Sequence, residues 1–230
     1  EVKKIIVRSY DDGKETKKFQ LDDFKGYIFE DKFVLIKGFK VDKDYIYISS
    51  STDTVTVLQI YTKTGELKHS YEEIRDFDID SKGNLFISGL LGTDDFKGIS
   101  VIDAKRGKEV YRIKTDNVEN FIRYNPTDNL LYCFNSLLDK KIKTYDVETR
   151  SFVETIFSFI KDASYNIDDC SIQDFLIDND GNLYISCVEQ IGDSWHDYFY
   201  TYKKIMGEEE KRPITLTVTA PYRDDFIQEA

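Results

Sequence analysis

The chain has 230 residues, 40% of them hydrophobic and 33% charged, and this composition excludes an intrinsically disordered or collagen-like chain. Acidic residues outnumber basic ones by 43 to 32, which gives a formal charge of −11 with no long basic run, so we expect no nucleic-acid partner. No apolar stretch reaches the roughly 18–20 residues that a membrane-spanning helix needs, so we expect no membrane insertion.

Apolar and polar residues alternate with a period of two along most of the chain, which predicts β-strands rather than helices. The strands pair into hairpins of two kinds, which follow each other along the sequence. In chain order the predicted hairpins are Ile5–Thr16, Tyr27–Ile36, Val41–Ser49, Val57–Leu67, Asp76–Ser88, Ile99–Val110, Phe121–Cys133, Ile142–Val153, Asp174–Ser186 and a longer one from Tyr198 to Val218.

The hairpins repeat in sequence as well as in pattern. Asp76–Ser88 and Asp174–Ser186 begin 98 residues apart and are identical at nine of thirteen positions. The shared residues are turn residues, such as Gly83-Asn84, and alternating apolar residues. Glycine adopts a positive φ without steric cost, and the preceding Asp80 and Asp178 are expected to bond the turn backbone.

Equivalent positions of the second kind of hairpin recur at intervals of 41 to 57 residues. Four strands per repeat at this period predict an all-β fold, a β-propeller of about five four-stranded blades, or part of a six-bladed ring. A β-sandwich is the alternative, but it does not predict a turn that recurs in phase. We expect one domain over 1–230, with repeats of about 1–38, 39–74, 75–118, 119–170 and 171–230.

The hairpin Asp76–Ser88, followed by Ile99–Val110, resembles repeats of the NHL, regucalcin/gluconolactonase and streptogramin-lyase propellers. The resemblance covers most of residues 40–219 and implies the fold, because the shared residues are turn and core residues. Lactone hydrolases similar to regucalcin hold a divalent ion with Glu, Asn and Asp at one end of the channel. This sequence has no Glu at the matching place.

Residues at the start of the inner strands are the first candidate site, because propeller ligands commonly sit at this end. They are Arg75, Asp76, Asn120 and Asp174. Asp76, Asn120 and Asp174 offer the oxygen ligands that Ca²⁺ takes, whereas Arg75 adds a cation that opposes a metal. The alternative is that both aspartates bond to backbone, so we expect no obligatory cofactor and keep calcium open.

The segment 190–198 is the second candidate, predicted as a loop that carries Trp195, His196 and Tyr198. Aromatic residues on loops are common binding anchors. Ser194, His196 and Asp197 are neighbours in sequence and lack a nucleophile elbow, so we do not expect a catalytic triad.

The function predicted from these patterns is a non-catalytic module for protein binding or self-assembly at a surface. Two alternatives stay open: a small-ligand or carbohydrate binder that uses the channel mouth and the 190–198 loop, and a metal-dependent lactonase-like hydrolase. The three cysteines form no CxxC pair, which disfavours a zinc site. The chain starts at Glu1, which favours an exported or cell-surface protein.

Overall fold

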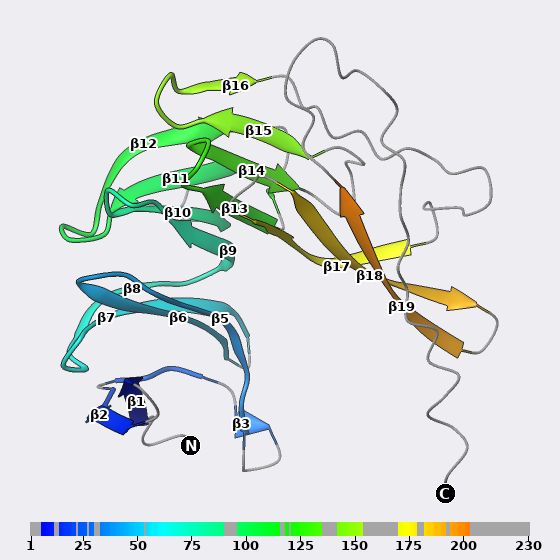
Figure 1. Ribbon diagram of the computed structural model, residues 1–230. Coiled ribbons are helices and arrows are strands. Elements are labelled where there is room, and N and C mark those ends of the chain that lie inside the picture. Colours follow the sequence, from blue (N-terminus) through cyan, green and yellow to red (C-terminus); the bar gives the residue numbers. More distant parts are fainter. Residues whose placement is uncertain are drawn as a thin grey trace, which may run out of the picture. The chain divides into compact units, whose positions relative to one another are not determined.

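The structure is a computed structural model in which every described element is a β-strand (Figure 1). It describes residues 6–11, 14–21, 23–26, 28–29, 33–52, 54–89, 96–115, 118–119, 121–134, 142–153, 170–178, 182–191 and 194–202. The chain divides into two compact units, Glu1–Ile122 and Arg123–Ala230. The described part contains no helix with the length and apolar character needed to cross a membrane.

The first unit holds two complete four-stranded antiparallel sheets, each a meander in which neighbours in sequence pair. One runs β5 (Ile36–Val41), β6 (Tyr45–Ser51), β7 (Thr56–Thr62) and β8 (Leu67–Tyr71); the next runs β9 (Ile74–Ile79), β10 (Asn84–Gly89), β11 (Gly98–Asp103) and β12 (Lys108–Lys114). Two short ladders precede them: β1 (Ile6–Asp11) with β2 (Lys14–Gln20), and β3 (Ile28–Phe29) with β4 (Phe33–Val34).

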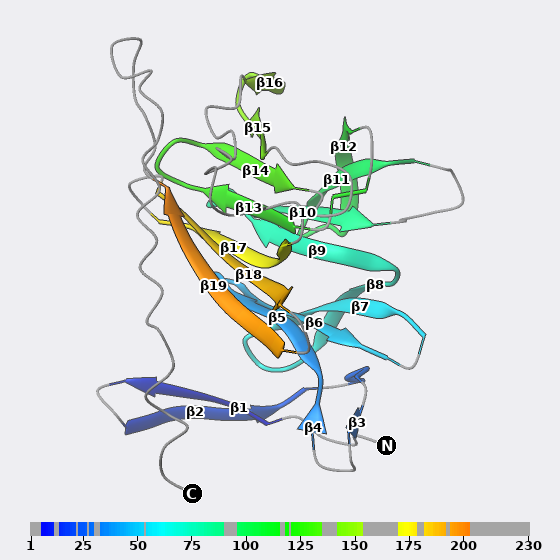
Figure 2. The same cartoon turned by 90° about the vertical axis from the view of Figure 1, so that its right-hand side faces the viewer.

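The second unit repeats the arrangement (Figure 2). A four-stranded sheet contains β13 (Phe121–Asn125), β14 (Leu130–Phe134), β15 (Lys143–Asp146) and β16 (Ser151–Val153). A three-stranded sheet follows, with β17 (Cys170–Ile177), β18 (Leu183–Ile191) and β19 (Ser194–Tyr202). The predicted return strand 214–218 and the predicted inner strand 222–228 lie outside the described residues.

The middle strands of the first two sheets are buried on both faces. β6, β7, β10 and β11 bury successive residues, including serines and Gln59, while the outer strand β8 alternates between half-buried and exposed residues. One apolar cluster takes residues from both sheets, among them Tyr47, Leu58, Phe77 and Leu85. Stacking of the sheets therefore buries faces that a single sheet would leave exposed, as in a propeller.

The predicted turn chemistry is present in two hairpins. Asp80 accepts hydrogen bonds from the Lys82 N–H (2.8 Å), the Asn84 N–H (2.8 Å) and the Asn84 side-chain amide (2.6 Å). Asp178 accepts the matching pair from Asn182, both at 2.8 Å. Gly83 has φ +86°, the left-handed conformation that the turn requires.

A tyrosine on the second strand of three hairpins donates its hydroxyl to the turn aspartate. The pairs are Tyr47 with Asp42 (2.7 Å), Tyr132 with Asp128 (2.6 Å) and Tyr184 with Asp178 (2.9 Å). Burial, and then the aspartate beside it, raises the pKa of both Tyr47 and Tyr132 well above the usual tyrosine value. These two hydroxyls are therefore protonated at neutral pH and donate to the aspartates.

Replacing Asp80 with alanine is expected to lower the free energy of unfolding by about 2 kcal/mol, because Asn84 loses its acceptor at a buried turn. Urea denaturation followed by circular dichroism measures the loss. The matched control is Asp44→Ala in the exposed β5–β6 turn, which should change stability by less than about 0.5 kcal/mol. Equal losses in the two variants would contradict the role given to Asp80.

Candidate functional site

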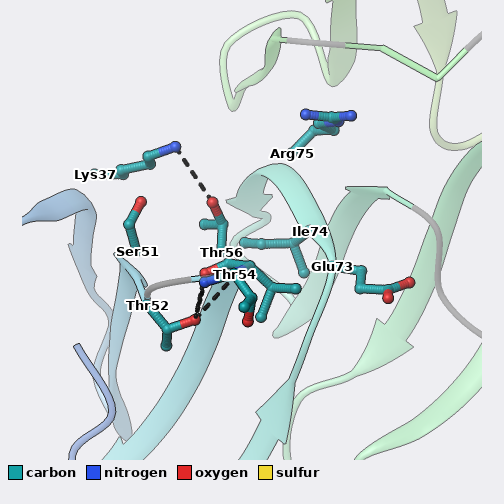
Figure 3. Close-up of a pocket in the computed structure, with 9 residues that line it drawn as sticks. Lys37, Ser51, Thr52, Thr54, Thr56, Glu73, Ile74 and Arg75 are labelled. Carbon is teal, nitrogen blue, oxygen red and sulfur yellow. Dashed lines mark hydrogen bonds between the residues drawn. The ribbon is translucent and has the colours of Figure 1, made fainter. Parts of the chain in front are cut away.

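A shallow pocket of about 320 Å³ lies in the first unit, where the β6–β7 turn meets the segment that enters β9 (Figure 3). Two neighbouring sheets contribute to it, through β5, the β6–β7 turn and the first residues of β9. The lining residues are Lys37, Ser51, Thr52, Thr54, Val55, Thr56, Glu73, Ile74 and Arg75. Four of these nine side chains carry a hydroxyl group.

Hydrogen bonds between Thr52 and Val55 close the β6–β7 turn. The Thr52 hydroxyl donates to the Val55 carbonyl (2.9 Å) and accepts from the Val55 N–H (3.1 Å). The Thr52 N–H donates to the same carbonyl (2.8 Å). This side-chain closure is a common use of threonine in turns, and it leaves Thr54 exposed at the mouth of the pocket.

On the β9 side of the pocket, the backbone of Glu73 packs closely against the backbone of Gly89. Glu73, just before β9, has φ +60°, a left-handed conformation that is uncommon for a residue with a side chain. Beneath it, Gly89 pairs with Ile74 at a register shift of the ladder. A Cβ on Gly89 would lie 2.5 Å from the Glu73 carbonyl oxygen. Only glycine therefore allows these two backbone segments to lie so close together.

The pocket carries two cationic side chains and one carboxylate. Lys37 Nζ donates to Thr56 Oγ1 (3.2 Å); Lys37 lies at the upper left of Figure 3 and Arg75 at the upper right. Glu73 extends away from Lys37 and the threonine hydroxyls. Within the described residues, no hydrogen bond or ion pair joins the Arg75 guanidinium to another side chain.

Of the predicted set, Arg75 is among the described residues that line this pocket. Lys37 and the hydroxyl groups did not enter that set. The sequence does contain a feature that could have indicated the hydroxyl groups. Serine or threonine occupies positions 49–52, 54 and 56, where a buried strand would normally show alternating apolar residues.

Asp76 follows Arg75 but points its carboxylate at backbone. It accepts from the Phe77 N–H and from the Ile122 N–H of β13, both at 2.9 Å. Asp76 therefore bonds to backbone, which is the alternative to calcium binding that the sequence raised. Asn120, the proposed neighbour in the calcium site, lies outside the described residues.

Asp174, at the equivalent place on β17, has a different partner. It accepts from Arg123 Nη2 on β13 (2.5 Å) and from the Phe175 N–H (2.7 Å). In the first unit a similar ion pair joins Lys40 on β5 to the buried Asp78 on β9. In both units an ion pair therefore links the first strands of successive sheets.

Among the described residues, no cluster of three or more histidine, cysteine, aspartate or glutamate side chains could hold a metal ion. The calcium site at Asp76, Asn120 and Asp174 stays a prediction. The two described carboxylates are already engaged, which means that calcium would have to replace or share these partners.

The prediction of a loop over 190–198 is wrong. Residues up to Ile191 belong to β18, and β19 begins again at Ser194, with Trp195 opposite Gln190, His196 opposite Glu189 and Tyr198 opposite Cys187. The run Trp-His-Asp-Tyr-Phe-Tyr-Thr-Tyr is rich in aromatic residues, which favour strands, and this outweighed the polar Gly192-Asp193-Ser194 signal.

The sequence matches neither a protein-family model nor a curated protein. Comparison with solved structures is informative about the fold. Kuenenia stuttgartiensis hydrazine synthase superposes with a TM-score of 0.58 at 12% identity, over 90% of this chain and 56% of that one. A chain of the mitotic checkpoint complex gives 0.54 at 10% identity, over 87% and 56%, and the N-terminal domain of Nup159 gives 0.53 at 12%, over 82% and 48%.

These neighbours are β-propeller proteins, and three of the described sheets are the four-stranded antiparallel meanders of that fold. The chain has a β-propeller fold. It spans about half the length of the solved structures it matches. Their titles name an enzyme, a checkpoint assembly and one domain of a larger protein, so the shared fold does not carry one function.

Proposed function

We propose that this propeller is a non-catalytic module that binds a protein partner, with the pocket end of the first two sheets as its recognition face. The observation that carries the proposal is the pocket itself: a shallow, hydroxyl-rich hollow with two cations that have no carboxylate partner among the described residues. Loops at one end of a rigid β-scaffold are a frequent place for binding residues.

The composition of the pocket favours binding over catalysis. Its nine lining residues include no histidine and no cysteine, and the hydroxyl of Thr52 is used to close a turn. Nucleophilic catalysis needs a nucleophile within hydrogen-bond reach of a base. The Thr56 hydroxyl lies within reach of Lys37 Nζ, at 3.2 Å, but it accepts a hydrogen bond from this cation rather than donating to a base. One of the similar solved structures is, by its title, part of a complex, which supports protein binding as a use of this fold.

The test is affinity capture from cells that produce the protein, with quantitative mass spectrometry of what is retained. A Thr54→Trp variant fills the mouth of the pocket from an exposed turn. Its matched control is Thr64→Trp, in the exposed β7–β8 turn at the other end of the same strand. We expect the wild type and the control to retain the same discrete proteins and Thr54→Trp to lose them at least tenfold.

Capture of the same proteins by all three forms, or of none by any, would overturn the proposal. Light scattering of the purified protein separates two kinds of partner. A monomer near 26.9 kDa indicates a foreign partner, whereas a defined oligomer that Thr54→Trp dissociates indicates a second copy of this chain.

A binder of carbohydrate through Trp195 and Tyr198, and a metal-dependent hydrolase of the lactonase type, are the alternatives that the sequence raised. Both aromatic residues belong to β19. The described lining of the pocket in the first unit supports the protein-binding proposal instead.

A further inference from the structure

We infer that the pocket receives a glutamate or aspartate side chain of the partner, held by Arg75 and Lys37. This inference rests on the proposed protein-binding function and adds the chemistry of the residue that enters. It follows from the charge, the hydrogen-bonding groups and the size of the pocket, taken in turn.

The local charge is opposite to that of the whole molecule. The chain carries a formal charge of −11, yet the described residues that line the pocket include two cations and one carboxylate, which leaves one net positive charge among them. Screening limits the reach of distant charges to about 8 Å at physiological ionic strength, so the nearest groups decide what binds. One net positive charge balances a carboxylate, whereas a doubly charged phosphate would leave an excess of negative charge.

Donors face the hollow in excess of acceptors. The Arg75 guanidinium makes no hydrogen bond or ion pair with the described residues, and it offers the planar pair of N–H groups that matches a carboxylate. Among the residues that the structure describes, Lys37 Nζ is bonded only to the neutral Thr56 hydroxyl. Because Thr56 Oγ1 accepts that bond, its own hydrogen remains to donate, and Thr54 and Ser51 supply further hydroxyl groups.

The size of the hollow suits a side chain rather than a whole ligand. Pockets for small molecules range from about 300 to 1,000 Å³, and this one, at about 320 Å³, lies at the lower end. It is also open, and its two cations come from exposed positions on β5 and at the start of β9. Exposed ion pairs are weak, so an isolated acidic side chain should bind with millimolar affinity and act as one anchor of a larger interface.

Weak binding of this kind is measured by NMR on the full ¹⁵N-labelled chain. The probes are the tripeptide acetyl-Gly-Glu-Gly-amide and its neutral analogue acetyl-Gly-Gln-Gly-amide, which has nearly the same shape. We expect the glutamate peptide to shift the Arg75 Nε–H signal and the backbone amides of 51–56 with saturation, and the glutamine peptide to leave them unchanged.

Two pocket variants, Arg75→Gln and Lys37→Gln, should each lower the affinity for the glutamate peptide by about fivefold. The matched control is Lys82→Gln, which removes one positive charge from the exposed β9–β10 turn and should leave the affinity unchanged. Melting curves of the three variants check that each is folded; since all three side chains are exposed, the melting temperature should be unaffected.

Equal shifts with glutamate and glutamine, or equal affinity in Arg75→Gln and Lys82→Gln, would overturn the inference. So would a phosphoserine peptide that binds more than tenfold tighter than the glutamate peptide, because the ligand would then be a phosphate. These outcomes are distinct from failure of the proposed function, which shows in the Thr54→Trp capture experiment whether or not an acidic side chain is the anchor.

Discussion

Replacing Phe77 with alanine should lower the free energy of unfolding by about 4 kcal/mol, the largest loss we expect from one substitution in the described core. Phe77 on β9 is 2% exposed and stacks on Tyr47 of β6, with ring centroids 6.4 Å apart and an angle of 29° between the rings. It belongs to the apolar cluster that both complete sheets of the first unit share. Its removal leaves a cavity where the two sheets meet.

Urea denaturation of the purified protein, followed by circular dichroism, measures this loss. Phe39 on β5 is the matched control, because it is the same residue type but 53% exposed. Phe39→Ala should cost less than about 1 kcal/mol. If the two variants lose the same stability, the sheets are not held together by the shared cluster in the way that we describe.

Replacing Gly89 with alanine should lower the free energy of unfolding by about 3 kcal/mol, because the added methyl group would clash with backbone atoms that cannot move aside. It would lie 2.5 Å from the Glu73 carbonyl oxygen and 2.8 Å from the Ile74 Cα. A clash with fixed atoms and a positive φ of 156° each add to the cost. The same push displaces Glu73 and Arg75, so we also expect the variant to bind the glutamate peptide more weakly.

The Gly83→Ala variant separates the cost of the steric clash from the cost of the positive φ. Gly83 has φ +86° as well, but a Cβ there meets no atom within 4 Å. We expect a loss of about 1 kcal/mol, the cost of the backbone conformation alone, with unchanged peptide binding. Thermal unfolding of the two variants side by side measures the difference; a Gly89→Ala variant no less stable than Gly83→Ala would rule out the close approach.

The pairing of strands within each hairpin was readable from the sequence, because it depends on short-range chemistry. Leu85 and Ile87 occupy alternate positions after a Gly-Asn turn, which predicts a strand on each side of the turn, and β9 and β10 pair as expected. The same reasoning failed over 190–198. There β18 extends to Ile191 and β19 begins at Ser194, whereas the polar residues of this segment suggested a loop.

The sequence by itself determined the all-β class, the four-stranded repeat and the role of Asp80 in its turn, since each depends on residues a few positions apart. Only the tertiary structure decided the partners of Asp76 and Asp174 and the site at Arg75. Lys37 and Arg75 are 38 residues apart and lie on separate sheets. Which side chains share a pocket depends on how the sheets stack, and no local pattern of the chain encodes that.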